Sequence, residues 1–263
     1  MEGEVKMQFR ILGVMEVWNG ERAIRLSPHM RDLLAVLLCT PNVVVPADRL
    51  IEELWGGRPP RTAGKVLQVK IHSLRRRLDG IRRIEHRPPG YVLAVNSGEL
   101  DALHFKELVE HGRAKVSAGH AAEGAEKFRK ALTLWQSAAY VGQEHLPTPR
   151  DESARLTEQR LAVVEELMQV ELARGCHADI IGDLYRFVAE NPFRERLRAQ
   201  LMLALYQLGR KAEALEVYRT GRRVLVEELG LDVGPELREL EQAILVNDPA
   251  LDPPATILTR LAP

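Results

Sequence analysis

The side chains with the clearest chemical potential lie between Arg58 and Tyr91, in a stretch that is rich in cations. It contains ten Lys and Arg residues and only two acids, Asp79 and Glu85. Cations at this density bind phosphates, and amide or hydroxyl groups set among them can hydrogen-bond to the edges of bases. The stretch therefore predicts a contact with nucleic acid.

The middle of this stretch has the apolar periodicity of an α-helix. Leu67, Ile71, Leu74 and Leu78 recur at spacings of 4, 3 and 4, which places them on one stripe. The opposite side then carries basic and hydrogen-bonding side chains, which are Lys65, Gln68, Val69, His72 and Arg76, with Ser73 at the edge. A helix with these two faces suits the major groove of DNA. The alternative is an ordinary amphipathic helix whose basic face meets only water.

Short strands and two further helices surround this helix in the order of a winged helix-turn-helix. Strands are predicted over 9–12, 14–18 and 24–26, with a hairpin turn at Asn19-Gly20. Helices follow over 31–39 and 47–55, and Pro59-Pro60 delays the start of the third helix until about 61–65. Asp79-Gly80 ends it, and strands over 82–87 and 91–95 form a wing around Pro88-Pro89-Gly90. Residues 1–97 are therefore predicted to be an α+β winged-helix DNA-binding domain with an extra N-terminal sheet.

Residues 98–248 are predicted to form an all-α domain of tetratricopeptide-like repeats. Gly119, Gly175 and Gly209 are each followed, at offsets 5, 9 and 12, by small, apolar or aromatic residues, and the last two glycines lie 34 residues apart, the tetratricopeptide period. Gly119 and Gly175 lie 56 residues apart, about 22 more than this period. The extra residues are placed around 137–153, where Pro147 and Pro149 are expected to break the helix. Residues 249–263 are predicted to be a loose C-terminal tail.

The aromatic side chains of the helical domain are expected in its core, with a cradle for a ligand as the alternative. They are Phe128, Trp135, Tyr185, Phe187, Phe193, Tyr206 and Tyr218. Trp55 is likewise expected to close the second helix from the core rather than to stack on a base.

Charge is divided between the two predicted domains, although the whole chain has a formal net charge of zero. Residues 1–97 contain 16 Lys and Arg against 10 Asp and Glu, and the rest contains 21 against 27. This division indicates one domain that meets a polyanion and one that does not. Cys39 and Cys176 lack metal or redox spacing, so both are expected to be reduced core thiols of a cytoplasmic protein without a membrane span.

No catalytic, metal or cofactor site is predicted. Gly56-Gly57 and Gly64-Lys65 suggest a phosphate-binding loop, but Pro59 stands where a glycine is needed and Val66 where Ser or Thr would bind magnesium. The histidines lack metal-ligand spacing. Surface or hairpin positions are expected for His104, His111, His120 and His177. An enzyme is therefore not expected.

Residues 7–250 resemble the Streptomyces antibiotic regulatory proteins (SARPs) in their short form. The motifs that carry the resemblance are ILGVMEVWNG, DRLIEELWGGRPPRTA, LQVKIHSLRRRL, RPPGYVL and RERLRAQLMLALYQLGRKAEALEVYR, followed by LVEELGLDVGPELREL. The family joins an OmpR-type winged helix to a bacterial transcriptional activation domain of tetratricopeptide-like helices. The chain departs from it at Pro46, where the family often has a capping Ser, and over residues 70–73, where it often has aromatic or β-branched residues and a Val-Ser pair.

The resemblance implies roles for individual side chains on DNA. Gln68, Val69 and Ser73 match positions that face bases. Four residues match positions that face phosphates or groove edges, namely Lys65, Lys70, His72 and Arg75. Arg76 points outward by helical geometry and is expected to contact either, while Arg58, Arg61 and Thr62 precede the helix and are expected to reach the backbone. Arg87 matches the wing arginine that enters the minor groove, with a solvated strand charge as the alternative.

The resemblance also implies an activator of a secondary-metabolite, antibiotic gene cluster. Such activators bind tandem direct repeats near the −35 region, associate head-to-tail on one DNA face, and engage RNA polymerase, including its sigma factor. No cofactor is implied. The alternatives are a tetratricopeptide adaptor with weak DNA affinity and a ligand-responsive repressor that uses the same DNA site.

Overall fold

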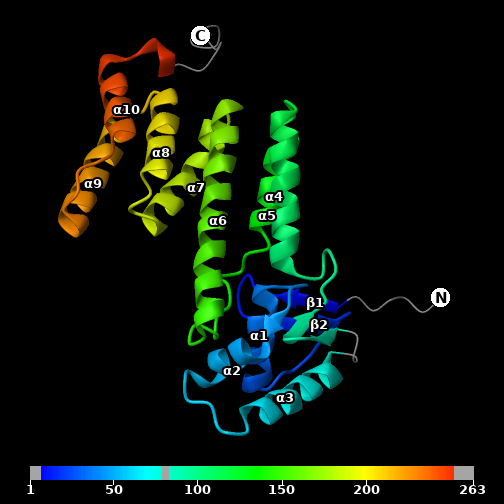
Figure 1. Cartoon of the computed structure of the whole chain (residues 1–263). Coiled ribbons are helices and arrows are strands. Elements are labelled where there is room, and N and C mark those ends of the chain that lie inside the picture. The colour runs from blue at the N-terminus through cyan, green and yellow to red at the C-terminus, as the bar shows by residue number, and fades with distance from the viewer. Residues whose placement is uncertain (1–6, 79–82, 252–263) are drawn as a thin grey trace. The chain divides into compact units, whose positions relative to one another are not determined.

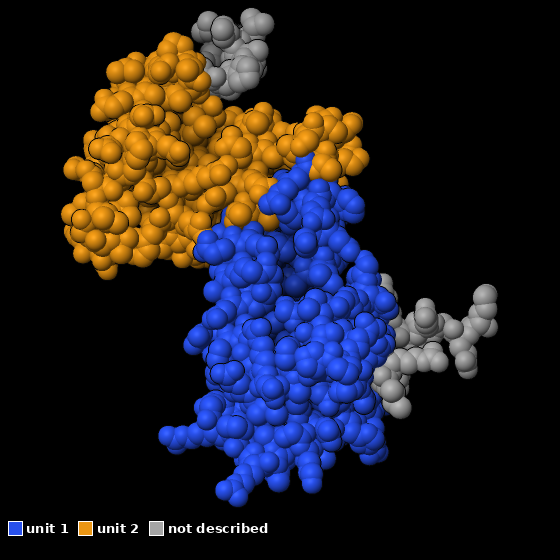
Figure 2. All heavy atoms as spheres, viewed as in Figure 1, with its two compact units in different colours: residues 1–113, 127–161 blue, residues 114–126, 162–263 orange. Residues whose placement is uncertain are grey.

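The computed structural model describes residues 7–78 and 83–251 (Figure 1). The chain divides into two compact units, which Figure 2 distinguishes by colour. Unit 1 comprises residues 1–113 and 127–161, and unit 2 comprises residues 114–126 and 162–263. The predicted helix end at Asp79-Gly80 and all but three residues of the predicted tail lie outside the described residues; those three, Pro249–Leu251, form a 3-10 turn.

The N-terminal sheet has three antiparallel strands in the order β1-β2-β3. They are β1 (Met7–Arg10), β2 (Glu16–Asn19) and β3 (Arg22–Ala23). Trp18 pairs with Ala23 and Asn19 with Arg22, so the turn residues are Gly20 and Glu21, and Gly20 adopts a φ of 60°. The returning strand therefore follows the turn at once, and the predicted bounds 24–26 are wrong: β3 ends at Ala23, and Ile24 adds one last hydrogen bond from its N–H to the carbonyl of Val17 at 2.8 Å.

Three helices and a second sheet complete the winged helix-turn-helix. The elements are α1 (Pro28–Cys39), β4 (Val45–Pro46), α2 (Ala47–Trp55), α3 (Ala63–Arg77), β5 (Ile84–Arg87) and β6 (Gly90–Leu93). The strands pair in the order β4-β6-β5. Helix α2 has the predicted bounds and ends at Gly56, whose φ of 58° suits a glycine. The predicted winged-helix fold with an N-terminal sheet is confirmed.

The start of α2 lacks a side-chain cap, as Pro46 in place of a capping serine requires. The wing supplies a backbone substitute, because the N–H of Ala47 donates to the carbonyl of Pro89 at 3.1 Å. This bond joins the first turn of α2 to the tip of the wing.

Residues from the helical region pack within unit 1 against the N-terminal sheet. The N–H groups of Gln136, Tyr140 and Val141 donate to the carbonyls of Leu12, Ile11 and Gly13 at 2.9, 2.9 and 3.1 Å. The ring of Phe105 meets the ring of Trp135 edge-on, with 5.6 Å between centroids. Because residues 11–13 are engaged in this way, the first strand ends at Arg10 rather than at the predicted residue 12.

The remainder of the chain is helical, as predicted. The helices are α4 (Asp101–Ser117), α5 (Ala121–Leu132), α6 (Pro147–Ala173), α7 (His177–Glu190), α8 (Glu195–Gln207), α9 (Lys211–Leu229) and α10 (Pro235–Val246). Pro147 and Pro149 do not break a helix but begin α6, since the first turn needs no backbone N–H. The non-helical part of the extra residues is thus 133–146.

The glycine repeat marks turns between consecutive helices. Gly119, Gly175 and Gly209 have φ values of 84°, 78° and 76°, and each lies just after one helix and before the next. The residues at the predicted offsets are all buried, among them Tyr218 and Gly221. These findings confirm the predicted tetratricopeptide-like arrangement.

Close packing explains why a glycine stands at 221. The Arg198 side chain is only 4% exposed and donates to the carbonyls of Val217 and Pro192 at 3.2 and 3.0 Å. A Cβ added at Gly221 would lie 2.2 Å from Arg198 Nε. A larger residue at this contact between α8 and α9 would therefore have to displace the buried Arg198 side chain.

Several side chains of the helical region differ from expectation. Tyr185 and Phe193 are 40% and 48% exposed, so the prediction that they are core residues is wrong, whereas Phe128, Trp135, Phe187 and Tyr218 are buried and Tyr206 is half-buried. His177 was expected at a surface or hairpin position; it begins α7 directly after the turn at Gly175, but its side chain is only 7% exposed.

Both cysteines are free thiols and half-buried. The Cys39 thiol donates to the carbonyl of Ala35 at 3.2 Å. Burial raises the pKa of the Cys39 thiol to about 12, so this thiol stays protonated at neutral pH.

Candidate nucleic-acid interface

Helix α3 is buried along the stripe that the sequence predicts. Leu67, Ile71, Leu74 and Leu78 are each at most 2% exposed. They face α1 and α2, which pack on this helix (Figure 1). The helix is therefore held by its apolar stripe, and its opposite side is left to solvent.

The opposite side of α3 is polar and exposed. The exposed side chains are those of Lys65, Gln68, Val69, His72, Arg76 and Arg77, and Ser73 is half-buried at the edge. Val69 is the apolar member of this side and is 65% exposed. We call Lys65, Gln68, Val69, His72, Ser73 and Arg76 the outer face of α3.

The loop before α3 presents three of the predicted contact residues. Arg58, Arg61 and Thr62 are exposed. The carbonyl of Pro60 accepts from the N–H of Ala63 at 2.9 Å, and that of Thr62 accepts from Val66 at 3.0 Å, but no side chain caps the helix. The N-terminal turn of α3 thus keeps open N–H groups beside cationic side chains, an arrangement that favours anions.

Lys70 is positioned differently from the outer face. It is half-buried, and its ammonium lies 5.7 Å from the centre of the Trp55 ring at the end of α2. Desolvation by burial lowers the pKa of the Lys70 ammonium, while the nearby Asp32 carboxylate opposes this shift. Trp55 is half-buried too, so it is a platform for Lys70 and not a fully enclosed core residue.

Arg75 links α3 to the wing. Its Nε donates to the carbonyl of Ile84 in β5 at 2.7 Å, and the side chain is half-buried. This bond holds the first residue of β5 beside the last turns of α3. This hydrogen bond therefore helps to fix the position of the wing relative to the outer face of α3.

The wing depends on a close backbone approach at Gly90. A Cβ at this position would lie 1.9 Å from the carbonyl oxygen of Val45 and 2.7 Å from Pro46 Cα. The Pro88–Pro89 peptide bond is cis, and His86 packs edge-on against Tyr91 with 5.2 Å between centroids. The sequence Pro-Pro-Gly-Tyr thus shapes the tip of the wing.

Arg87 projects from β5 and is 61% exposed. Its Nε and Nη2 donate to Glu85 Oε2 at 2.9 and 2.7 Å. Sequence reasoning missed this partner, although the spacing of two along a strand was the available signal, since such residues share a face.

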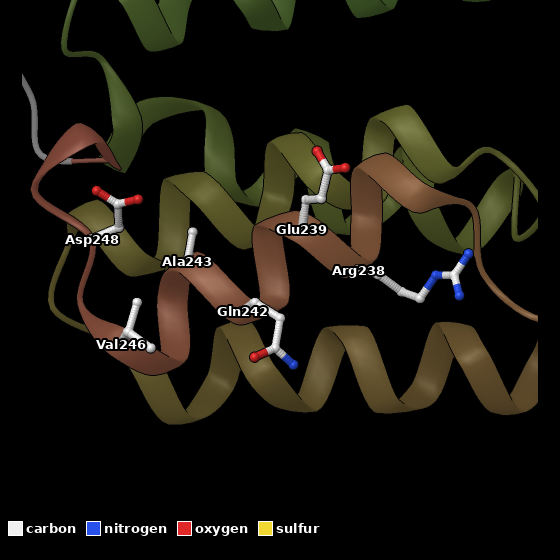
Figure 3. A pocket seen from close by; sticks show the side chains of 6 residues that line it. All are labelled: Arg238, Glu239, Gln242, Ala243, Val246 and Asp248. Atoms are coloured by element: carbon white, nitrogen blue, oxygen red, sulfur yellow. The ribbon is translucent and has the colours of Figure 1, made fainter.

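A pocket of about 420 Å³ lies on α10, and Figure 3 shows its lining, which consists of Arg238, Glu239, Gln242, Ala243, Val246 and Asp248. These side chains include no pair of nucleophile and base. Within residues 7–78 and 83–251, no group of three His, Cys, Asp or Glu residues is placed to hold a metal ion. No helix in the same residues is long and apolar enough to cross a membrane.

Family models match both parts of the chain. The model described as "Transcriptional regulatory protein, C terminal" matches residues 20–93, which include α3 and the wing. The model described as "Bacterial transcriptional activator domain" matches residues 100–245.

The curated relatives include regulatory proteins of Streptomyces. "Regulatory protein AfsR" of Streptomyces coelicolor is 38% identical over 93% of this chain and 25% of its own length. "Regulatory protein DnrI" of Streptomyces peucetius is 34% identical over 94% of each protein. "Transcriptional regulator RedD" of Streptomyces coelicolor is 32% identical over 87% of this chain and 67% of its own length. The chain thus spans about a quarter of AfsR but nearly all of DnrI.

A solved structure has a similar fold. It is "Mycobacterium tuberculosis EmbR in complex with low affinity phosphopeptide", with a TM-score of 0.89 at 27% identity. The match covers 93% of this chain and 66% of the EmbR chain.

Proposed function

Because the chain belongs to the Streptomyces antibiotic regulatory protein family of transcriptional regulators, we propose that it is a sequence-specific activator that binds promoter DNA through α3 and the wing. The outer face of α3 carries the proposal. It is exposed, and it contains cationic and amide side chains together with the exposed Val69. A major groove supplies phosphates, base edges and thymine methyl groups for these side chains.

Base contacts are assigned to the middle of the outer face. Gln68 can bond to adenine through both its amide oxygen and its amide nitrogen, Val69 can meet a thymine methyl, and Ser73 can bond to either kind of base edge. Gln68 and Val69 are neighbours in one turn of α3, and Ser73 lies about one turn later. They are proposed to determine which sequence is bound.

Phosphate contacts are assigned to side chains around that patch. The set comprises Arg58, Arg61, Thr62, Lys65, Lys70, His72 and Arg75, with Arg76 able to reach either a phosphate or a base. Lys70 and Arg75 have partners in the free protein, Trp55 and the Ile84 carbonyl, so each uses only its remaining donors on DNA. Phosphate contacts set the register and the salt dependence of binding and carry no sequence information of their own.

Arg87 is assigned to the minor groove next to the major groove that α3 enters. Its exposure and its place on β5 near the tip of the wing support this role. Winged helices dock one helix in the major groove, so a neighbouring arginine can sample the adjacent groove.

The domain assignment follows from these roles. Residues 1–97 are proposed as the DNA-binding domain, residues 98–248 as the transcriptional activation domain, and residues 249–263 as a tail.

The target is proposed to be an antibiotic biosynthetic gene cluster, with tandem direct repeats near the −35 region. Copies are proposed to bind head-to-tail, and the activation domain to engage RNA polymerase and its sigma factor. The protein acts in the cytoplasm, at the nucleoid.

Selection of bound duplexes from a random library tests the DNA-binding role. The full-length chain is used at one fixed salt concentration, because affinity for DNA depends strongly on salt. Recovery of direct repeats spaced by whole helical turns supports the proposal. Recovery of no motif, with binding that is merely salt-sensitive, favours an adaptor built on the helical repeats.

Transcription in vitro with RNA polymerase tests the sign of regulation. A template carrying the selected repeats upstream of its −35 region is expected to give more transcript when the protein is added. A decrease in transcript would instead identify a repressor that uses the same site.

A further inference from the structure

We infer that Glu85 holds the Arg87 side chain in the free protein. Whether Arg87 enters the minor groove then depends on whether that groove is A·T-rich or G·C-rich. This inference rests on the proposed function, in which Arg87 enters that groove. It assigns to Glu85 a role in specificity, although the side chain is acidic and lies in a surface that binds a polyanion.

The two side chains share one face of β5. They are two residues apart in a strand, so they point to the same side, and His86 points to the other side and packs on Tyr91. Glu85 Oε2 accepts from both Nε and Nη2 of Arg87, at 2.9 and 2.7 Å. The guanidinium is therefore fixed in direction, with two of its donors occupied.

No other charge lies directly across the strand. In the register of β5 and β6, Arg87 pairs with Gly90 and Glu85 with Val92, neither of which carries a charge. Glu85 is also the only acid in the sequences of these two strands. The intact pair thus cancels the charge that Arg87 would otherwise bring to DNA.

The pair is weak enough for some DNA to open it. The side chains of Arg87 and Glu85 are 61% and 41% exposed, and ion pairs at such exposure are worth about two- to fivefold in an equilibrium constant. A narrow A·T-rich minor groove concentrates negative potential and attracts arginine more strongly than a wide G·C-rich groove. The A·T-rich groove therefore competes successfully with Glu85 for the guanidinium, and the G·C-rich groove does not.

Glu85→Gln is the variant that distinguishes a groove that can displace Glu85 from one that cannot. The amide keeps the size of the side chain but loses the charge that holds Arg87. Arg87 then becomes available to any groove, so binding to G·C-rich DNA gains the most.

The experiment measures the affinity of the full-length chain for two duplexes of about 30 base pairs. One contains an A-tract, the other only G·C pairs, and neither depends on knowing the natural operator. Glu85→Gln is expected to tighten binding to the G·C duplex by about two- to fivefold and to the A-tract duplex by less. The salt slope on the G·C duplex is expected to steepen by about one, because the freed Arg87 brings one more cation to the DNA and displaces its counterions.

Glu16→Gln is the matched control. The Glu16 side chain is 41% exposed, as Glu85 is, and lies 3.8 Å from Arg10 on the N-terminal sheet of the same unit. This variant changes the net charge of the protein by the same amount, so it reports the effect of losing a carboxylate that does not bind Arg87. It is expected to leave the preference between the two duplexes unchanged.

The Arg87→Gln background decides whether Glu85 acts through Arg87. In that background Glu85→Gln is expected to have no effect beyond that of the control. Equal tightening with and without Arg87, or equal effects of Glu85→Gln and Glu16→Gln, would overturn the inference. If Arg87→Gln itself changes neither affinity, the assignment of Arg87 to the minor groove is rejected. A clear effect of Arg87→Gln together with a silent Glu85→Gln rejects only the inference about Glu85.

Discussion

The ammonium of Lys70 lies 5.7 Å from the centre of the Trp55 ring, so α3, the helix proposed to enter DNA, contacts the C-terminal end of α2 through this pair. Cation–π contacts of this kind are favourable by about 0.5–1 kcal/mol at exposed sites. The contact leaves the charge of Lys70 near the surface of α3 but restricts the conformations of its side chain. The Lys70 side chain is thus already oriented in the free protein, before DNA binds.

Lys70→Ala is expected to weaken binding to specific and random DNA alike and to lower the salt slope by about one, because one phosphate contact is lost. Binding isotherms over a series of salt concentrations measure both quantities. Lys106→Ala is the control, since Lys106 is an exposed lysine on α4 and pairs with Glu110 at 3.9 Å. An unchanged slope for Lys70→Ala would contradict a phosphate role.

Gly90→Ala is expected to destabilise the fold by about 3 kcal/mol or more, because the new Cβ cannot avoid backbone atoms of Val45 and Pro46. Urea denaturation measures the loss. The control is Gly64→Ala in α3, where a Cβ meets nothing within 4 Å and the helix is expected to gain up to about 1 kcal/mol. A wild-type midpoint for Gly90→Ala would show that β4 and β6 do not approach as described.

Asp101 predicts a dependence of stability on pH. Its carboxylate accepts from the N–H groups of Ile11, Leu12 and Ala102 at 2.8–3.0 Å. Desolvation by burial nevertheless raises the pKa of this carboxyl from 3.8 to about 6, against the opposing effect of those hydrogen bonds. The folded chain therefore keeps the proton at pH values where the unfolded chain has released it.

The sign follows from this order of proton release. The contribution of Asp101 to stability is complete below about pH 4, falls as the pH rises to about 6, and is constant above about 7. The difference in the free energy of unfolding between wild type and Asp101→Asn is expected to shrink over that interval, since Asn does not titrate. Denaturation at a series of pH values measures it. A difference that stays constant or grows between pH 4 and 6 would show that burial does not dominate at this carboxyl.

Local sequence patterns were sufficient to predict α3 and α2. The apolar stripe of α3 is set by a period that any buried helix must follow, and α2 ends at the glycine that the sequence offers. The outer face of α3 follows from the same period, so most of the candidate site was predictable. The glycine turns of the repeat were predictable for the same reason, since a positive φ selects glycine.

Contacts between distant segments were not predictable. The bonds from Gln136, Tyr140 and Val141 to residues 11–13 involve backbone atoms, which carry no sequence signal. Pro147 and Pro149 gave a misleading signal, because proline breaks a helix interior but is tolerated in a first turn. The partners of Lys70 and Arg87 depend on side-chain directions that become defined only when α2, α3 and β5 are in place.

The most direct test of the central claim, that the outer face of α3 reads sequence, is a comparison of wild type with Gln68→Ala. Both are measured at fixed salt against the duplex recovered by selection, against every single-base-pair variant of it, and against random DNA. Gln68→Ala is expected to lose about 1–3 kcal/mol of discrimination at one base pair and to bind random DNA as wild type does. An equal loss of affinity for the selected duplex, all its variants and random DNA would contradict the claim.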